Sequence, residues 1–285
     1  IPRERAITAA GPVGEDGTVT APDIRLIAVD MDGTLLDADG RIPDGLWRLL
    51  PRLRDRGIVF APASGRQLAT LRRQFADAPV ELDYIAENGA YVVRDGAEIS
   101  SDAVDPEFAA SVVRRIRGLD HLDVGLVVCG KRSAYIERAD DTFFAEADTY
   151  YAELAVVDDL TRVDDEILKL AVFDFARAED SVARELTDLR ATHQVVVSGQ
   201  HWVDIMNPGV NKGRALARLQ ETLGIGPQHT MAFGDYLNDL ELLQQARYSY
   251  AMAEAHPEIA AVARYSAPSH TEAGVLTVIE EFLAR

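Results

Sequence analysis

Two aspartates, Asp30 and Asp32, directly follow a short apolar run and carry the strongest chemical signal in the chain. The run, Ile24–Val29, has the length and composition of a buried strand. An Asp-rich turn is one interpretation of the pair, but a turn does not require an aspartate at the carboxyl end of the strand. A carboxylate pair at this place suits a reaction in which one group attacks and the other transfers protons. Gly33 would let the backbone bend closely around an incoming phosphoryl group.

Two further segments could hold an anion. Ser64 and Gly65 follow a second apolar run, Ile58–Ala63, and their hydroxyl and free amides open a predicted helix. Such an end attracts anions, although an ordinary capping serine is the alternative. Lys212 begins another predicted helix, where the helix dipole disfavours a cation. Because only three of the 29 basic residues are lysine, Lys212 predicts a compact charge that faces an anion.

The other cations near these segments are interpreted as structural. Arg66 could bind phosphate, but a salt bridge is the simpler expectation in a chain so rich in arginine. The remaining lysines, Lys131 and Lys169, are attributed to chance. Lys212 is therefore the one lysine to which we assign a function.

An acidic cluster completes the set of candidate residues. Asp235 follows the predicted strand Thr230–Phe233, and Asn238 and Asp239 fall on the first turn of the next predicted helix. Oxygen ligands in such a cluster suit Mg²⁺, a hard cation that retains waters. Helix capping by Asp235 explains one or two of these residues, but not their occurrence together with the other motifs.

The elements around the first two motifs predict how they are positioned. Strands alternate with helices, which predicts a parallel sheet covered by helices on both faces. In such sheets, ligands gather at the carboxyl ends of the strands, where Asp30 and Ser64 both lie. The predicted elements are the strands Ile24–Val29, Ile58–Ala63 and Tyr84–Ala86 and the helices Pro43–Arg56 and Gln67–Phe75.

The middle of the chain, residues 92–200, changes to a mixed pattern of helices and strands. We interpret it as an α+β cap domain inserted into one doubly wound, Rossmann-like α/β core of residues 23–91 and 201–285. Residues 1–22 are predicted to be a flexible leader. The elements predicted near the cap include the helices Pro106–Arg117, Asp141–Leu154 and Glu179–Leu189 and a hairpin of Val195–Ser198 with Trp202–Met206.

Composition excludes several classes of partner. The formal net charge of −18 repels polyanions, so we expect no nucleic-acid or anionic-membrane binding. No apolar run approaches the ~20 residues that span a bilayer, and the first residues lack the apolar core of a signal peptide. With Cys129 as the only cysteine, these features favour a cytoplasmic protein, which we expect to be a monomer or a weak homo-oligomer.

Taken in order, these motifs resemble those of the haloacid dehalogenase superfamily. Two further segments are typical of its Cof-type, class IIB-like sugar phosphatase branch, and the predicted cap resembles the larger α/β cap of that branch. The superfamily motifs correspond to Asp30-Met31-Asp32-Gly33-Thr34-Leu35, Ser64, Lys212, and Gly234-Asp235 with Asn238-Asp239, and the branch segments to Glu87–Ala90 and Asn207–Gly213.

The resemblance implies a role for each residue. Asp30 would attack phosphorus and form an aspartyl-phosphate, and Asp32 would protonate the leaving alkoxide and then activate water. Mg²⁺ would be held by Asp30, the backbone carbonyl of Asp32, and Asp235. The phosphoryl oxygens and the metal shell would be held or oriented by Ser64, Gly65, Lys212, Asn238 and Asp239.

The implied function is a Mg²⁺-dependent phosphatase that hydrolyses small phosphorylated metabolites, such as sugar phosphates. A phosphomutase or phosphotransferase on the same fold is an alternative, and a non-catalytic phosphate-binding regulatory module is another. The carboxylate of Asp32 favours hydrolysis or a mutase reaction, because superfamily ATPases lack it and their aspartyl-phosphate persists. The cap would act as a lid, with hinges expected at Gly89 and Asn207–Gly209.

Overall fold

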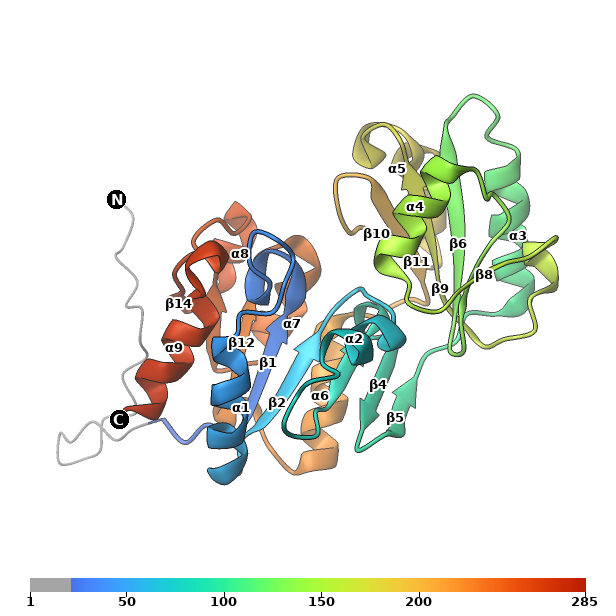
Figure 1. Cartoon of the computed structure of the whole chain (residues 1–285). Coiled ribbons are helices and arrows are strands. Elements are labelled where there is room, and N and C mark those ends of the chain that lie inside the picture. The colour runs from blue at the N-terminus through green and yellow to red at the C-terminus, as the bar shows by residue number, and fades with distance from the viewer. Residues whose placement is uncertain (1–21) are drawn as a thin grey trace.

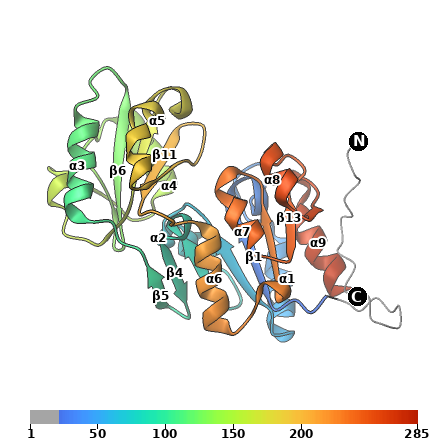
Figure 2. The same ribbon diagram turned by 180° about the vertical axis from the view of Figure 1, so that it is seen from behind.

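The computed structural model describes residues 22–285, so the predicted leader lies outside the described residues except for Pro22. The strands of the described part form an eight-stranded sheet and a six-stranded sheet. Figures 1 and 2 show these sheets, each with its own helices, as two bodies joined by a narrow connection. No helix among residues 22–285 is long and apolar enough to cross a membrane.

The eight-stranded sheet forms the core. Its first six strands pair in parallel and the last two add an antiparallel meander, which confirms the predicted α/β class. In spatial order the strands are β14 (Tyr265–Ser266), β13 (Tyr248–Ala251), β12 (Thr230–Gly234), β1 (Leu26–Asp30), β2 (Val59–Ala63), β3 (Tyr84–Ala86), β4 (Tyr91–Arg94) and β5 (Ala97–Ser101).

Helices cover both faces of this sheet, which explains why its strands are apolar on both sides. In β1, Ile27 and Val29 pack toward one set of helices, whereas Leu26 and Ala28 pack toward the other. The first set lies in front of the sheet in Figure 1 and the second in front of it in Figure 2. The sets are α1 (Gly45–Asp55), α2 (Leu68–Gln74) and α9 (Gly274–Leu283), and α6 (Lys212–Leu223), α7 (Leu240–Gln244) and α8 (Pro257–Val262).

Strand β1 lies at the point where the chain changes direction across the sheet. It pairs with β2 on one side and with β12 on the other. The chain runs from β2 toward β3 at one side of the sheet and from β12 toward β13 at the other side. Because these connections run in opposite directions, a crevice opens at the carboxyl end of β1. Asp30 is the last residue of that strand.

The six-stranded sheet belongs to the cap. Helices α3 (Pro106–Arg117) and α5 (Val182–Glu185) pack on one face and α4 (Asp141–Tyr150) on the other. Its strands, in spatial order, are β10 (Gln194–Val197), β11 (Trp202–Met206), β9 (Ile167–Asp174), β6 (Val124–Gly130), β7 (Ala134–Ile136) and β8 (Leu154–Val156).

The pairing of strands corrects both predicted domain borders. The border between residues 91 and 92 cuts through β4, which continues the core sheet together with β5. The border between residues 200 and 201 separates β10 from β11, although the two form one antiparallel hairpin. Because hydrogen-bonded strands share a sheet, we propose that the cap extends from α3 to β11.

Two predicted helices were too long. The helix predicted over Asp141–Leu154 ends at Tyr150, and Leu154 begins β8, which pairs in parallel with β7. The segment Glu179–Leu189 contains only the short helix α5 between two 3₁₀ turns. In both places, packing against the cap sheet outweighs local helix propensity. Strands β4, β5, β8 and β14 were not predicted.

Candidate active site

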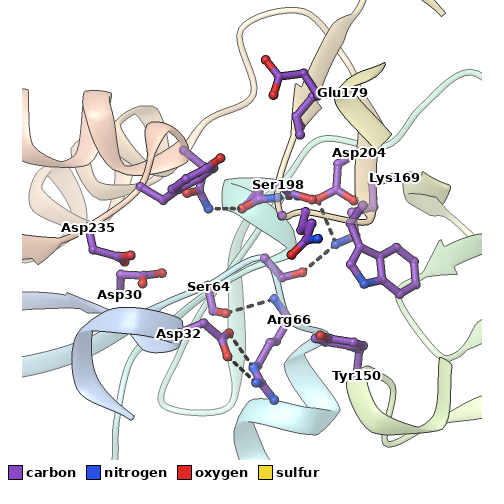
Figure 3. Close-up of a pocket in the computed structure, with 18 of the residues that line it drawn as sticks. Asp30, Asp32, Ser64, Arg66, Tyr150, Lys169, Glu179, Ser198, Asp204 and Asp235 are labelled. Carbon is purple, nitrogen blue, oxygen red and sulfur yellow. Dashed lines mark hydrogen bonds and ion pairs between the residues drawn. The ribbon is translucent and has the colours of Figure 1, made fainter. Parts of the chain in front are cut away.

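A cavity of about 620 Å³ lies between the carboxyl end of β1 and the cap. Figure 3 shows Asp30 and Asp235 on one side of it, and Tyr150, Lys169 and Asp204 on the other. The predicted site residues that line this cavity are Asp30, Asp32, Ser64, Gly65, Asp235 and Asn238. Lys212 and Asp239 are fully buried immediately behind Asp30.

Lys212 links two carboxylates at the base of the cavity. Its Nζ atom lies 2.5 Å from Oδ1 of Asp30 and 2.7 Å from Oδ1 of Asp239. Burial opposes the charged amine, but the two carboxylates outweigh it and raise the pKa of Lys212. The pKa of Asp30 is also raised, first by burial and then by the charge of Asp239, against the opposing effect of Lys212. The ammonium therefore offsets only part of the negative charge gathered here.

Asp235 is held against the loop that follows β1. The Thr34 hydroxyl donates a hydrogen bond of 2.9 Å to Oδ1 of Asp235. Gly33 has a φ of +76°, and a Cβ atom there would lie 2.5 Å from Oδ2 of Asp235. A glycine is therefore needed for the loop to approach this carboxylate. Burial, followed by the charge of Asp239, raises the pKa of Asp235 to about 6.

The acidic cluster fits a divalent cation. Carboxylate oxygens of Asp30, Asp235 and Asp239 lie within 4.8 Å of one another, and such oxygens are the ligands that Mg²⁺ prefers. Asp239 is already occupied, because Oδ1 accepts from Lys212 and Oδ2 accepts the backbone N–H groups of Asp235 and Tyr236. Asp30 and Asp235 are therefore the carboxylates best placed to hold the ion, with Asp239 orienting them.

Asp32 points away from the acidic cluster toward Arg66 (Figure 3). The Arg66 guanidinium donates to both carboxylate oxygens of Asp32, at 2.8 and 2.5 Å. The expected salt bridge of Arg66 is thus present, and its partner is the proposed acid–base residue. The carboxylate of Asp32 is not part of the acidic cluster.

Ser64 and Gly65 form a loop before α2 and do not open the helix as predicted. Helix α2 begins at Leu68, so the backbone N–H groups near Ser64 belong to a loop and not to the first turn of a helix. The Ser64 Oγ atom accepts the N–H of Arg66 at 3.1 Å, which leaves its own hydrogen free to meet an anion. A Cβ atom on Gly65 would lie 3.0 Å from the Asn88 side chain, so the small residue lets these two loops meet.

Asn238 is connected to the loop that follows β3. Its side-chain amide donates to Oδ1 of Asn88 at 3.2 Å, and the Asn88 amide donates to Asp204 of the cap at 2.6 Å. From the sequence, Asn88 was expected to have no role beyond its family motif, and Asp204 was not predicted to belong to the site. Their contacts join the core to the cap.

Attributing Lys169 to chance was wrong. This cap residue is only 3 % exposed, and its Nζ atom lies 2.6 Å from the carbonyl oxygen of Gly65 and 3.0 Å from Glu87. The scarcity of lysine, which drew attention to Lys212, could have identified it. Lys131 differs, because it is only partly buried and pairs with Glu98 and Glu166.

The raised pKa of Asp235 predicts how the stability of the metal-free protein depends on pH. Since its pKa is 3.8 in the reference state and about 6 when folded, the folded protein binds more protons between these values. Its contribution to stability is therefore complete below pH 3.8 and is lost as pH rises through about 6. Thermal unfolding of the parent and of Asp235→Asn, measured in a chelator, should show the parent losing stability relative to the variant over this range.

Added Mg²⁺ should restore stability to the parent at neutral pH, because the cation takes the place of the proton. Parallel pH dependences for the parent and Asp235→Asn would show that the carboxylate of Asp235 does not titrate in this range.

The sequence matches a family model described as haloacid dehalogenase-like hydrolase over residues 27–279. Among curated proteins, it is 34% identical over 263 residues to the 5-amino-6-(5-phospho-D-ribitylamino)uracil phosphatase YbjI of Escherichia coli strain K12, covering 91% of this chain and 96% of that protein.

Solved structures show the same fold. The crystal structure of SMU.1108c from Streptococcus mutans matches with a TM-score of 0.84 and 29% identity, over 92% of this chain and 100% of that one. The HAD subclass IIB sugar phosphatase BT4131 matches with a TM-score of 0.78 over 90% of this chain and 98% of that one. At 20% identity, the second match concerns the fold alone.

Proposed function

This chain is a phosphatase of the haloacid dehalogenase-like hydrolase family, and from that premise we propose that it hydrolyses small phosphorylated metabolites through an aspartyl-phosphate on Asp30, with Mg²⁺ as cofactor. The observation that carries the proposal is the position of Asp30. It ends the central strand at the crevice, lies beside Lys212, and belongs to the acidic cluster.

The first half-reaction transfers the phosphoryl group to the protein. A carboxylate oxygen of Asp30 attacks phosphorus as the bond to the ester oxygen breaks. The leaving alkoxide takes a proton from Asp32 and departs as an alcohol. Lys212 and the Ser64 hydroxyl hold the equatorial oxygens, on which charge is spread in the transition state.

The second half-reaction releases inorganic phosphate. Asp32, now ionised, takes a proton from a water molecule, which attacks phosphorus and restores the carboxylate of Asp30. Both carboxylate oxygens of Asp32 accept hydrogen bonds from Arg66, so this pair must shift for Asp32 to exchange protons with the substrate. The same carboxylate can serve both steps because it faces the cavity.

Asp30, Asp235 and the backbone carbonyl of Asp32 would hold Mg²⁺, which supplies positive charge that stabilises the phosphoryl group during transfer. Asp239 orients this set by holding Lys212 and the backbone of Asp235. The ion would also compensate the carboxylate charge that Lys212 leaves uncompensated.

The cap residues that line the cavity favour a substrate that carries a ring. Tyr150 and Trp202 line it and meet edge to face, with ring centroids 5.4 Å apart. Aromatic surface of this kind favours planar groups. The Escherichia coli relative is named for a uracil ring linked to a phosphorylated ribityl chain. We propose a substrate of this chemistry, in which the phosphate reaches Asp30 and the ring lies against the cap.

A phosphate-release assay on a panel of phosphorylated metabolites tests both the phosphatase reaction and the preference for a substrate that carries a ring. We expect release of inorganic phosphate that requires Mg²⁺ and is highest for esters that combine a polyol phosphate with a nitrogen heterocycle. Trp202→Ala should raise KM for these esters more than for simple sugar phosphates, because only the former use the ring surface.

Each outcome separates the alternatives. Formation of a phosphorylated product without release of phosphate would favour a mutase or phosphotransferase. Phosphate binding without turnover of any ester would favour a regulatory module. Equal rates on sugar phosphates and ring-bearing esters would contradict the ring subsite but leave the phosphatase assignment intact.

A further inference from the structure

Lys169 lies on β9, in the interior of the cap sheet, yet two of its three polar partners belong to the core. Its Nζ atom donates to the carbonyl oxygen of Gly65 at 2.6 Å and pairs with Glu87 at 3.0 Å and with Asp204 at 3.5 Å. Gly65 directly follows Ser64, and Glu87 follows β3. One cap side chain therefore contacts both core loops, and Figure 3 shows it beside Asp204 at the cavity.

A second series of hydrogen bonds runs from Asp204, a partner of Lys169, to the segment of Asn238 and Asp239. Asp204 accepts from the Asn88 amide at 2.6 Å, and the Asn88 oxygen accepts from Asn238 at 3.2 Å. Asn238 precedes Asp239, which holds Lys212. The cap thus reaches two parts of the phosphoryl site: the Ser64 loop directly, and the Asn238 segment through Asn88.

Lys169 and its two carboxylate partners form a buried group. Lys169, Glu87 and Asp204 are each almost fully buried. Burial disfavours the charged amine, but Asp204 and Glu87 outweigh it and raise the pKa of Lys169. An ammonium group has three hydrogens, and three acceptors surround this one. Lys169 is only 3 % exposed, and its ammonium is held by two hydrogen bonds and an ion pair, so any effect on turnover would pass through the loops that it holds.

The backbone of the second loop is in an uncommon conformation. Glu87 and Asn88 have φ values of 51° and 55°, in the left-handed region that residues other than glycine rarely adopt. Such a conformation persists when its surroundings hold it. Lys169 and Asp204 contact these two side chains from the cap.

We propose that Lys169 is a positioning residue that aligns the Ser64–Gly65 loop and, with Asp204, the Asn88–Asn238 contact when the cap lies on the core. The phosphoryl site would be correctly assembled only in that arrangement. The inference rests on the proposed function, because it assigns Lys169 a part in the same reaction. It predicts that removing the ammonium weakens phosphate binding and turnover even where the fold is unaffected.

The experiment must separate positioning from stability. Lys169→Met alone would leave two buried carboxylates without their cation and could unfold the protein. The informative pair is therefore Glu87→Gln and Glu87→Gln with Lys169→Met, which removes Lys169 in a background that carries one fewer buried charge. Lys131→Met is the matched control, because Lys131 also joins the cap to the core but contacts no loop of the site.

We expect the double variant to lose kcat by about 10²-fold relative to Glu87→Gln, the usual effect of a misplaced reacting group. Its inhibition constant for inorganic phosphate should rise, and amide exchange in the Ser64–Arg66 segment should become faster. Lys131→Met should change none of these. Asp204→Asn, which keeps both core contacts of Lys169, should lower kcat through the Asn88 path alone.

Unchanged kcat, phosphate affinity and exchange in the double variant would overturn the proposal and leave Lys169 as an ion-pair residue. If the parent hydrolyses no phosphate ester, the proposed function fails instead. Phosphate affinity and amide exchange would still test the alignment of the loop, since neither needs turnover. If the double variant does not fold, Asp204→Asn decides: an unchanged kcat there would also overturn the proposal.

Discussion

Asp30→Asn is expected to lower phosphatase turnover by more than about 10³-fold, as removal of a nucleophile does in other enzymes, while the protein remains folded. The amide has nearly the same shape as the carboxylate but cannot attack phosphorus. The measurement is release of p-nitrophenol from p-nitrophenyl phosphate in the presence of Mg²⁺. Trapping labelled phosphate on the parent, but not on the variant, would identify the covalent intermediate.

The structure explains why the variant should fold. Asp30 lies close to two other carboxylates and is buried, so its pKa is raised and its charge is unfavourable in the metal-free protein. Lys212 would keep its contact with Asp239. We therefore expect metal-free Asp30→Asn to melt no lower than the parent.

The control is Asp39→Asn, which changes an exposed aspartate nine residues farther along the same segment. It should keep full activity. If Asp30→Asn turns over substrate as fast as the parent, the nucleophile has been assigned to the wrong residue.

Asp32→Ala is expected to lower steady-state turnover by on the order of 10²–10⁴-fold, the usual contribution of a general acid or base. The two half-reactions should respond differently. Nitrophenolate leaves without a proton, so phosphorylation by p-nitrophenyl phosphate should be largely spared, whereas hydrolysis of the aspartyl-phosphate loses its base. Stopped-flow measurement should then show a burst of nitrophenolate that matches the enzyme concentration, followed by slow turnover.

The salt bridge with Arg66 offers a competing explanation for such a loss, because Asp32→Ala also removes the partner of this guanidinium. Arg66→Met breaks the same pair and keeps the carboxylate. It should show no burst. If the two variants behave alike, Asp32 acts by holding Arg66, and its role as acid and base is wrong.

Much of the core could be predicted from local sequence. The strand before Asp30 is apolar on both faces, and such a strand is easily recognised when a helix pattern follows it. The carboxyl ends of parallel strands meet at one edge, so residues at those ends could be grouped without knowing the structure. This reasoning, and not the motifs alone, placed Asp30 and Ser64 at the same crevice.

The cap was predicted less accurately for a physical reason. Strand β8 of the cap is only three residues long, and it forms because a neighbouring strand offers hydrogen bonds. The same holds for β14 in the core, which has two residues. Strands this short contain too few residues to show the alternation of apolar and polar side chains by which a strand is recognised from sequence. The border at residue 200 was wrong because it ignored the pairing of β10 with β11, whose hairpin had itself been predicted.

Residue types and local patterns were enough to indicate which side chains can do the chemistry: Asp30, Asp32, Lys212 and Asp235 are of types that attack, transfer protons or bind a cation, and each lies at the end or start of a local element. Tertiary structure decided which groups meet across long stretches of chain. Arg66 contacts Asp32 across 34 residues and Lys169 contacts Gly65 across 104. Such contacts leave no local pattern, because they form only when the fold brings together groups that are distant in the sequence. For Lys169, which is buried, pairing is then required, since an unpaired buried charge is costly. The scarcity of lysine made Lys169 conspicuous, but only the packed structure shows what it binds.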